Sequence, residues 1–146
     1  MSLELVLVFA LATPPSAGSL QSALDRKGIP IRVSQSGDLQ KHTGFFPLDY
    51  EARKTGFYVT QLTYKELTSD YPQAKIPSDA AGSAISLGWS GNFLECASVF
   101  QVASILVFEF GAQAFDTESA SYVPLKEISN SAAACYEESK KQQSPR

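Results

Sequence analysis

The side chains best suited to acid–base chemistry are scarce in this chain of 146 residues. Its single histidine, His42, stands in a polar stretch beside Lys41 and Thr43. A histidine acts as a general acid or base only when the fold places its reaction partner within hydrogen-bond reach. No carboxylate or nucleophile accompanies His42 at a fixed spacing, so we interpret it as an exposed loop residue.

Sequence motifs for nucleophilic and phosphate chemistry are also missing. The run Gly88-Trp89-Ser90-Gly91 shares letters with the nucleophile elbow G-x-S-x-G, but Ser90 is displaced from the position of the nucleophile. Neither G-x-x-x-x-G-K-[ST] nor G-x-G-x-x-G occurs. Carboxylates are scattered, and no two share a helical face in an apolar setting suited to acid–base catalysis. We therefore predict no catalytic residue, no cofactor and no enzymatic activity.

Two cysteines, Cys96 and Cys135, both fall among apolar residues in segments expected to be helical. This setting favours buried free thiols, because a free cysteine packs as a small apolar side chain. A disulfide between the two helices stays open, since bridging depends on geometry that spacing does not reveal. A zinc site is not expected, because there is one histidine and no cysteine pair at ligand spacing.

The positions of these side chains depend on the helices and strands that carry them. The stretch from Ile85 to Phe115 is the most informative about those elements. We expect a short strand to Trp89, a turn, and then an apolar helix of about 18 residues that ends at Gly111. Asn92 is a suitable N-cap, and Glu95 can reach back to the N–H of that cap. A helix that is apolar on most sides must be covered, so we place it in the core, against a sheet and a neighbour or at a dimer seam. It is too short and too interrupted to predict a membrane span.

The remaining elements alternate between short apolar strands and amphipathic helices. Leu3 to Leu11 is almost continuously apolar, which is typical of a central strand covered on both faces. The other expected elements are a helix to Lys27, a strand over 29–33, a hairpin over 44–50 and 55–62, a helical turn over 64–69, a strand over 112–115 and a last helix from Pro124. The predicted fold class is α+β, with a mainly antiparallel sheet of about five or six strands and three main helices packed on it. We expect one domain over residues 1–139 and a flexible C-terminal tail over 140–146.

Composition narrows the class of partner. Hydrophobic residues make up 44% of the chain, charged residues 18%, and the net charge is −3 with a pI of about 5.1. A general nucleic-acid binder is usually basic, so direct nucleic-acid binding is disfavoured. The apolar run from Leu5 to Ala12 imitates a signal peptide, but Glu4 stands where positive charge is expected. We expect a cytoplasmic protein that binds no membrane.

Aromatic and acidic residues supply the candidate contact surface. Tryptophan and tyrosine dominate binding hot spots, and an acidic rim suits a basic partner. The residues that we predict to bind a partner are Asp49, Tyr50, Glu51, Tyr58, Asp70, Tyr71, Asp79 and Trp89. The alternatives are a core anchor for Trp89 and an ordinary solvated acidic face for the others.

Two segments together resemble a known group of small bacterial proteins. The first, GFFPLDYEARKTGFYVTQL from Gly44 to Leu62, is similar to a glycine-aromatic-x-proline pattern followed by glycine-phenylalanine and a strand. The second runs from Ile85 to Ile128 and is similar to a strand ending in Trp-Gly-Gly, a long helix, a strand ending in Asp, and Tyr-x-Pro before a last helix. This chain has Ser90 and Asn92 where that group has glycine and aspartate. Some members are identified as immunity proteins encoded beside secreted polymorphic or type VI secretion toxins, particularly nucleases.

The resemblance implies an immunity protein that neutralises a cognate toxin, by covering its active site or blocking its assembly. The resemblance implies no catalytic residue. Other hypotheses are a small ligand-binding or enzymatic domain, with a pocket near His42 or Trp89, and an adaptor that dimerises through the long helix. The sequence leaves the oligomeric state open.

Overall fold

The computed structural model of the protein describes residues 3–9, 13–34, 38–75 and 82–143. It has the predicted α+β class, with a seven-stranded antiparallel sheet in the order β2-β3-β4-β5-β1-β6-β7. The strands are β1 Leu3–Phe9, β2 Ile31–Val33, β3 Gly44–Tyr50, β4 Arg53–Thr63, β5 Ser83–Trp89, β6 Gln113–Asp116 and β7 Ser121–Val123. The helices are α1 Ala17–Arg26, α2 Tyr64–Asp70, α3 Phe93–Phe110 and α4 Leu125–Gln143, with the short 3₁₀ helix η1 at Pro72–Ala74.

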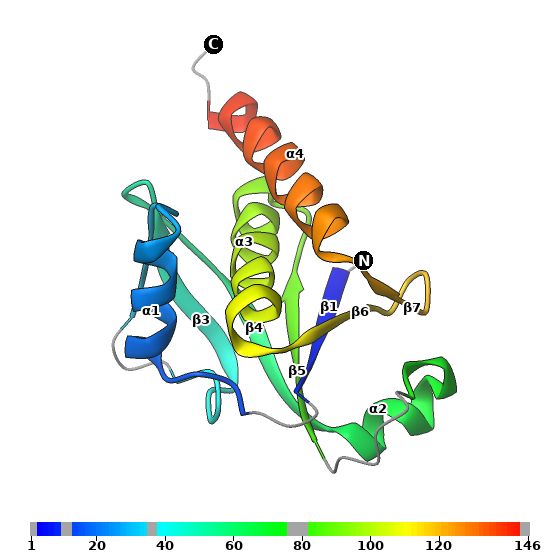
Figure 1. Ribbon diagram of the computed structural model, residues 1–146. Coiled ribbons are helices and arrows are strands. Elements are labelled where there is room, and N and C mark those ends of the chain that lie inside the picture. Colours follow the sequence, from blue (N-terminus) through cyan, green and yellow to red (C-terminus); the bar gives the residue numbers. More distant parts are fainter. Residues whose placement is uncertain (1–2, 10–12, 35–37, 76–81, 144–146) are drawn as a thin grey trace.

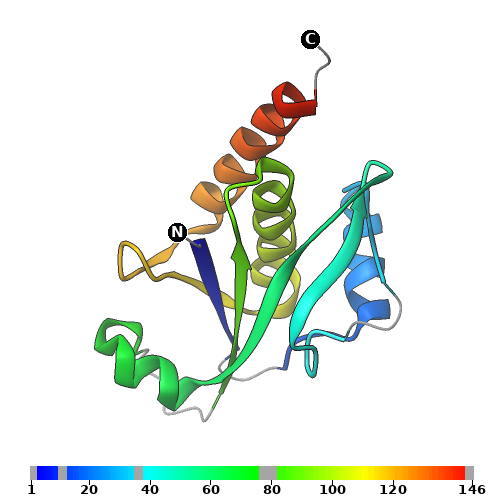
Figure 2. The same cartoon turned by 180° about the vertical axis from the view of Figure 1, so that it is seen from behind.

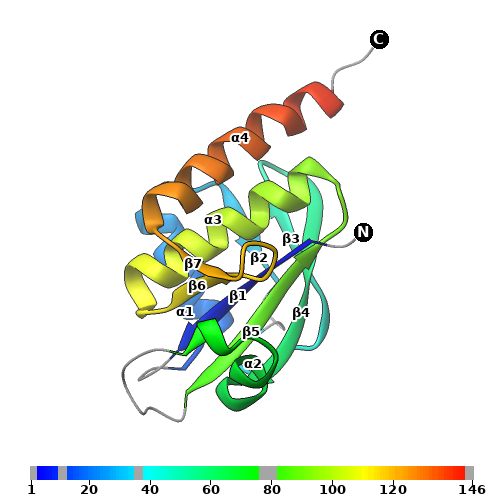
Figure 3. The same cartoon turned by 90° about the vertical axis from the view of Figure 1, so that its right-hand side faces the viewer.

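The sheet separates two layers of unequal size. Helices α1, α3 and α4, the three main helices expected from the sequence, lie on one face (Figure 1). Seen from behind, strands β3, β4 and β5 lie in front of α3, with α2 at one end of the sheet (Figure 2). The side view shows the same division, with α3 and α4 on one side and α2 on the other (Figure 3). Part of one sheet face therefore carries no helix among the described residues.

Strand β1 lies inside the sheet, between β5 and β6, as its apolar sequence predicts. Leu5 and Leu7 point into the main core under the helices. Val6 and Val8 point to the opposite side and join a smaller cluster with Leu67 of α2. Alternate side chains of a strand face opposite sides, so a strand that is apolar at every position needs cover on both sides.

Helix α3 is the core helix predicted from the sequence. Asn92 caps it by accepting hydrogen bonds from the N–H groups of Leu94 (2.9 Å) and Glu95 (3.1 Å). Gly111 follows with a φ of 73°, a left-handed conformation that glycine adopts without steric cost. The hydrogen bond of the Glu95 side chain differs from the prediction. Its carboxylate accepts from the N–H of Ser90 (3.3 Å) and not from the N–H of the cap residue Asn92. By length and composition α3 could cross a membrane; in the structure it packs between the sheet and α4, as predicted for a core helix.

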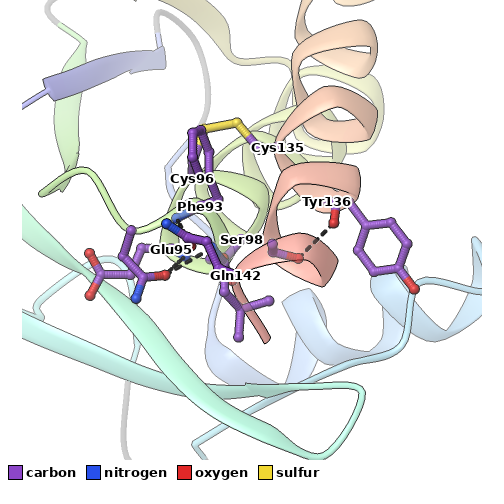
Figure 4. The surroundings of a disulfide bond; sticks show 10 residues. Phe93, Glu95, Cys96, Ser98, Cys135, Tyr136 and Gln142 are labelled. Carbon is purple, nitrogen blue, oxygen red and sulfur yellow. Dashed lines mark hydrogen bonds between the residues drawn. A yellow bond between two sulfur atoms is a disulfide. The ribbon is translucent and has the colours of Figure 1, made fainter. Parts of the chain in front are cut away.

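The structure corrects the favoured interpretation of the cysteines. Cys96 of α3 and Cys135 of α4 form a disulfide, with their Cα atoms 5.8 Å apart, instead of two free thiols (Figure 4). Near the C-terminal end of α4, Gln142 accepts a hydrogen bond from the N–H of Phe93 (3.2 Å). Spacing alone could not reveal the bridge because 39 residues separate the cysteines. The bridge and the hydrogen bond attach α4 to the first turn of α3.

One additional strand and the end of the last helix also differ from the sequence interpretation. The short strand β7 was not predicted; it pairs with β6 and brings the sheet to seven strands rather than five or six. Three residues are too few for a pattern of alternating burial to stand out. Helix α4 continues to Gln143, so residues 140–143 are helical and do not belong to the expected tail. Residues 144–146 lie outside the described part of the chain.

Candidate binding surfaces

Two of the predicted contact residues, Tyr50 and Trp89, are core residues, with exposed fractions of 2% and 7%. Tyr50 stacks on Tyr136 of α4 with ring centroids 5.5 Å apart, and its hydroxyl accepts a hydrogen bond from Gln101 (3.3 Å). Burial raises the pKa of Tyr50, since the phenolate would lose its hydration. Trp89 packs edge-on against Phe100 with centroids 5.3 Å apart. The core-anchor alternative therefore describes the packing of Trp89.

Glu51 lies at the tip of the β3–β4 hairpin and contacts α4. Both of its carboxylate oxygens accept from the hydroxyl of Tyr136, at 2.8 and 2.7 Å, and one lies 3.6 Å from Arg53. This hydrogen bond raises the pKa of Tyr136, because ionisation would break it and place two negative charges together. Glu51 and Ala52 form a two-residue turn with φ of 52° and 64°. The predicted loop over 51–54 is shorter in the structure because β4 begins at Arg53.

The remaining predicted residues lie on separate parts of the molecule. Asp49 and Tyr58 are on the sheet face that points away from α3. Asp70 and Tyr71 lie at the end of α2, where the ring of Tyr71 packs against Phe115 (centroids 5.5 Å apart). Asp79 lies outside the described residues. The structure does not bring these side chains together into one surface.

The uncovered part of the sheet, on β3, β4 and β5, is called the open face here. Phe45 and Tyr58 are paired neighbours on it, with rings edge-to-face at 5.3 Å and exposed fractions of 41% and 53%. The Phe45 ring also covers Gly56, where an added Cβ would lie 2.7 Å from a ring carbon. Phe45 was not among the predicted contact residues. Successive side chains of a strand face opposite sides, so with Phe46 in the core Phe45 points outward.

The open face continues into polar and charged surroundings. Beside the Phe45 ring, a groove of about 740 Å³ is bordered by Arg32, Asp49 and Lys54. Across the sheet, the hydroxyl of Ser86 donates to the carboxylate of Glu4 at 2.5 Å. An exposed aromatic centre inside a charged rim has the composition of a protein-binding surface.

A second concave surface, called the acidic cleft here, lies at one end of the sheet and encloses about 700 Å³. It is lined by the first residues of β1, the β6–β7 hairpin and the start of α4, together with Trp89 of β5 and Phe100 of α3. Its lining includes the apolar side chains of Leu3, Trp89 and Phe100 and the carboxylates of Asp116, Glu118 and Glu127.

The hairpin beside the cleft is held by its own hydrogen bonds. The Asp116 carboxylate accepts from the N–H of Glu118 (3.1 Å) and from the hydroxyl of Ser119 (3.0 Å). On the other face of this hairpin, Tyr122 donates to the backbone oxygen of Ala74 (2.5 Å), which connects the hairpin to η1. Burial is the main cause that raises the pKa of Tyr122 to about 12. These bonds fix the position of Asp116 and of the turn that follows it.

His42 has a structural contact instead of a free, exposed ring. Its Nε2 atom is 2.6 Å from the backbone oxygen of Phe45, and the ring packs edge-on against Phe46 (centroids 5.3 Å apart). Within the described residues, no group of three or more histidine, cysteine, aspartate or glutamate side chains could hold a metal ion. His42 therefore contacts two residues near the start of strand β3.

Comparisons of the chain with models of protein families, with curated proteins and with solved structures find no match.

Proposed function

We propose that this protein is a cytoplasmic immunity protein that binds and neutralises a cognate bacterial toxin, a nuclease of a polymorphic or type VI secretion system. The resemblance of the segments 44–62 and 85–128 to such proteins motivates the class. The observation that carries the proposal is the exposed pair Phe45 and Tyr58 on the open face. Inhibition would follow from covering the active site of the toxin or from blocking its assembly.

The aromatic pair is suited to high affinity because it is ordered before binding. Phe45 lies against both Tyr58 and Gly56, and both rings project from a sheet rather than from a loop. Rings held in this way lose little conformational freedom when a partner covers them. Burial of such rings at the centre of an interface typically gives the largest single contributions to binding.

The charged rim supplies selectivity and faster encounter. Arg32, Asp49 and Lys54 present both signs of charge beside the pair, and the chain as a whole is acidic. A net negative inhibitor is attracted to the basic surface that a nuclease uses to hold nucleic acid. The proposal needs no bond to be made or broken by this protein.

Co-expression tests the proposal directly. The product of the gene beside this one is expressed alone and with this protein, and growth and complex formation are measured. We expect toxicity alone and relief by this protein. If the neighbouring product is toxic and this protein neither relieves the toxicity nor co-purifies with it, the immunity function is wrong.

Variants of the aromatic pair test the surface. Tyr58→Ala should weaken toxin binding by about 30-fold or more, the size of a hot-spot loss. Phe108→Ala is the matched control, because Phe108 is also an exposed aromatic residue (58%) but lies on α3, where Lys27 covers its ring at 3.9 Å. Equal affinity of the two variants would exclude the open face as the contact surface.

A further inference from the structure

The acidic cleft carries carboxylates that have no basic partner among the described residues. Glu118 and Glu127 line it and are exposed, and neither side chain forms a hydrogen bond or ion pair with any described residue. By contrast, Glu137 and Glu138 further along α4 pair with Lys140 and Lys141. No lysine or arginine is among the described residues that line the cleft. The cleft therefore holds negative charge that the described part of the chain does not neutralise.

The inner part of the cleft is apolar and aromatic. Trp89 is 93% buried, and its side chain lies on the helix side of the sheet, against Phe100. Its indole N–H forms no hydrogen bond with the described residues, and Trp89 is one of the residues that line the cleft. An unpaired indole donor beside a cavity is a group that a bound molecule can satisfy.

We propose that the acidic cleft receives a lysine- or arginine-bearing segment of a partner protein. The alkyl part of such a side chain would lie on Leu3, Trp89 and Phe100, and its cation would reach the carboxylates of Glu118 and Glu127. Long basic side chains bind in this divided manner, with an apolar stem and a charged head. Aromatic faces add attraction for the cation. A backbone oxygen of the segment would accept from the indole N–H.

The partner in this inference is the toxin, so the inference rests on the proposed function. It adds a second contact, distinct from the aromatic pair on the open face. A cavity of about 700 Å³ falls in the range of sites that enclose a drug-sized ligand, which suits a short segment of chain better than a single ion. The complementary charge selects a basic segment over an acidic or neutral one.

The test uses Trp89, the single tryptophan of the chain, as the reporter of occupancy. The intact protein is titrated with the peptide acetyl-Lys-Leu-Lys-amide, and the indole emission is recorded. We expect a saturable change with this peptide and none with acetyl-Glu-Leu-Glu-amide. The double variant E118Q/E127Q should bind about tenfold more weakly, because two exposed ion pairs are lost. The control E137Q/E138Q removes the same charge elsewhere and should bind as the unmodified protein does.

Three results would overturn the inference. The first is no saturable change up to about 10 mM peptide, a concentration that corresponds to a negligible affinity. The second is an unchanged titration of E118Q/E127Q. The third is equal or tighter binding of spermine, which would identify a free polyamine, and not a protein segment, as the occupant. The melting temperature of E118Q/E127Q is measured beside that of the unmodified protein, because equal values show that a difference in peptide affinity does not arise from unfolding.

The outcomes separate this inference from the proposed function. If the protein neutralises its toxin and E118Q/E127Q binds that toxin with full affinity, only the role of the cleft is wrong. If the peptide binds in the cleft but no neighbouring toxin is neutralised, the immunity function is wrong, and the basic segment that the cleft receives belongs to another partner protein.

Discussion

The disulfide between Cys96 and Cys135 gives the most quantitative prediction. The change is the double variant Cys96→Ala/Cys135→Ala, compared with reduction of the unmodified protein. The bridge closes a loop across a sequence separation of 39 residues. In the chain-entropy treatment, such a loop lowers the entropy of the unfolded chain by about 13 cal/mol/K, which corresponds to about 4 kcal/mol at room temperature. Reduction should lower the free energy of unfolding by about that amount.

The expected change in melting temperature follows from the size of the chain. A protein of this length loses about 3 °C for each kcal/mol, so the midpoint should fall by roughly 12 °C on reduction. Thermal unfolding is followed by circular dichroism with and without reductant. The double variant should melt near the reduced protein and should not respond to reductant, which is the matched control. Alkylation of the unfolded, unreduced protein should modify neither cysteine.

The contrary result is equally clear. If two thiols are alkylated without reduction in protein purified under oxidising conditions, the cysteines are free and the pairing of α3 with α4 is wrong. If the bridge is present and reduction lowers the midpoint by less than about 3 °C, the unfolded-chain argument is wrong for this loop. The second result would mean that the reduced unfolded chain retains structure around α3 and α4.

The same bridge bears on the proposed compartment. Disulfides are rare in the cytosol, where thiols are kept reduced. An immunity protein that acts in the cytoplasm must therefore fold with Cys96 and Cys135 reduced. Small domains have 5–15 kcal/mol of stability in total, so a loss of about 4 kcal/mol is tolerable only near the middle of that range or above. A reduced protein that stays folded is thus a requirement of the cytoplasmic assignment.

Two further predictions concern the hairpin turn and a buried tyrosine. Ala52→Gly should raise the free energy of unfolding by about 0.5–1 kcal/mol, because glycine adopts the left-handed conformation at a φ of 64° without strain. The control Ala134→Gly, on the exposed side of α4, should lower it by about 1 kcal/mol, and chemical denaturation distinguishes the two. For Tyr122 the folded pKa of about 12 lies above the ordinary value of 10.0, so its stabilising contribution is complete below pH 10 and is lost as the pH rises toward 12. Denaturation across this range should show a decline of at most about 2 kcal/mol that is smaller in Tyr122→Phe.

Local patterns predicted most of the elements because they depend on neighbours in sequence. The N-cap of Asn92, the helix end at Gly111 and the apolar run of β1 are each visible in neighbouring residues. The structure confirms helix α3 and strand β1, the elements that these patterns predicted. The disulfide and strand β7 lacked such a cause. Cys96 and Cys135 meet only because α4 returns along α3, and β7 is too short to show a period.

The candidate surfaces were less predictable for a related reason. The alternation of side chains along the strands could place Phe45 and Tyr58 on the same side of a hairpin. It could not show that α2 covers only another part of that sheet face and leaves both rings exposed. The acidic cleft depends on the strand order β5-β1-β6, which places Trp89 and Asp116 on opposite sides of β1. That order arises from pairing between distant segments, and no local pattern encodes it.

The two proposed surfaces meet at one end of the sheet. Leu3 pairs with Trp89 there, and both residues border the acidic cleft as well as a smaller hollow beside Tyr58 on the open face. A partner that binds at this end of the sheet could therefore cover the aromatic pair with one part of its surface and place a basic segment in the cleft with another. Two moderate contacts on one rigid body bind more tightly than either contact alone, because the second is made without a new loss of translational freedom. A protein of this size could reach high affinity in this way without a large continuous apolar patch.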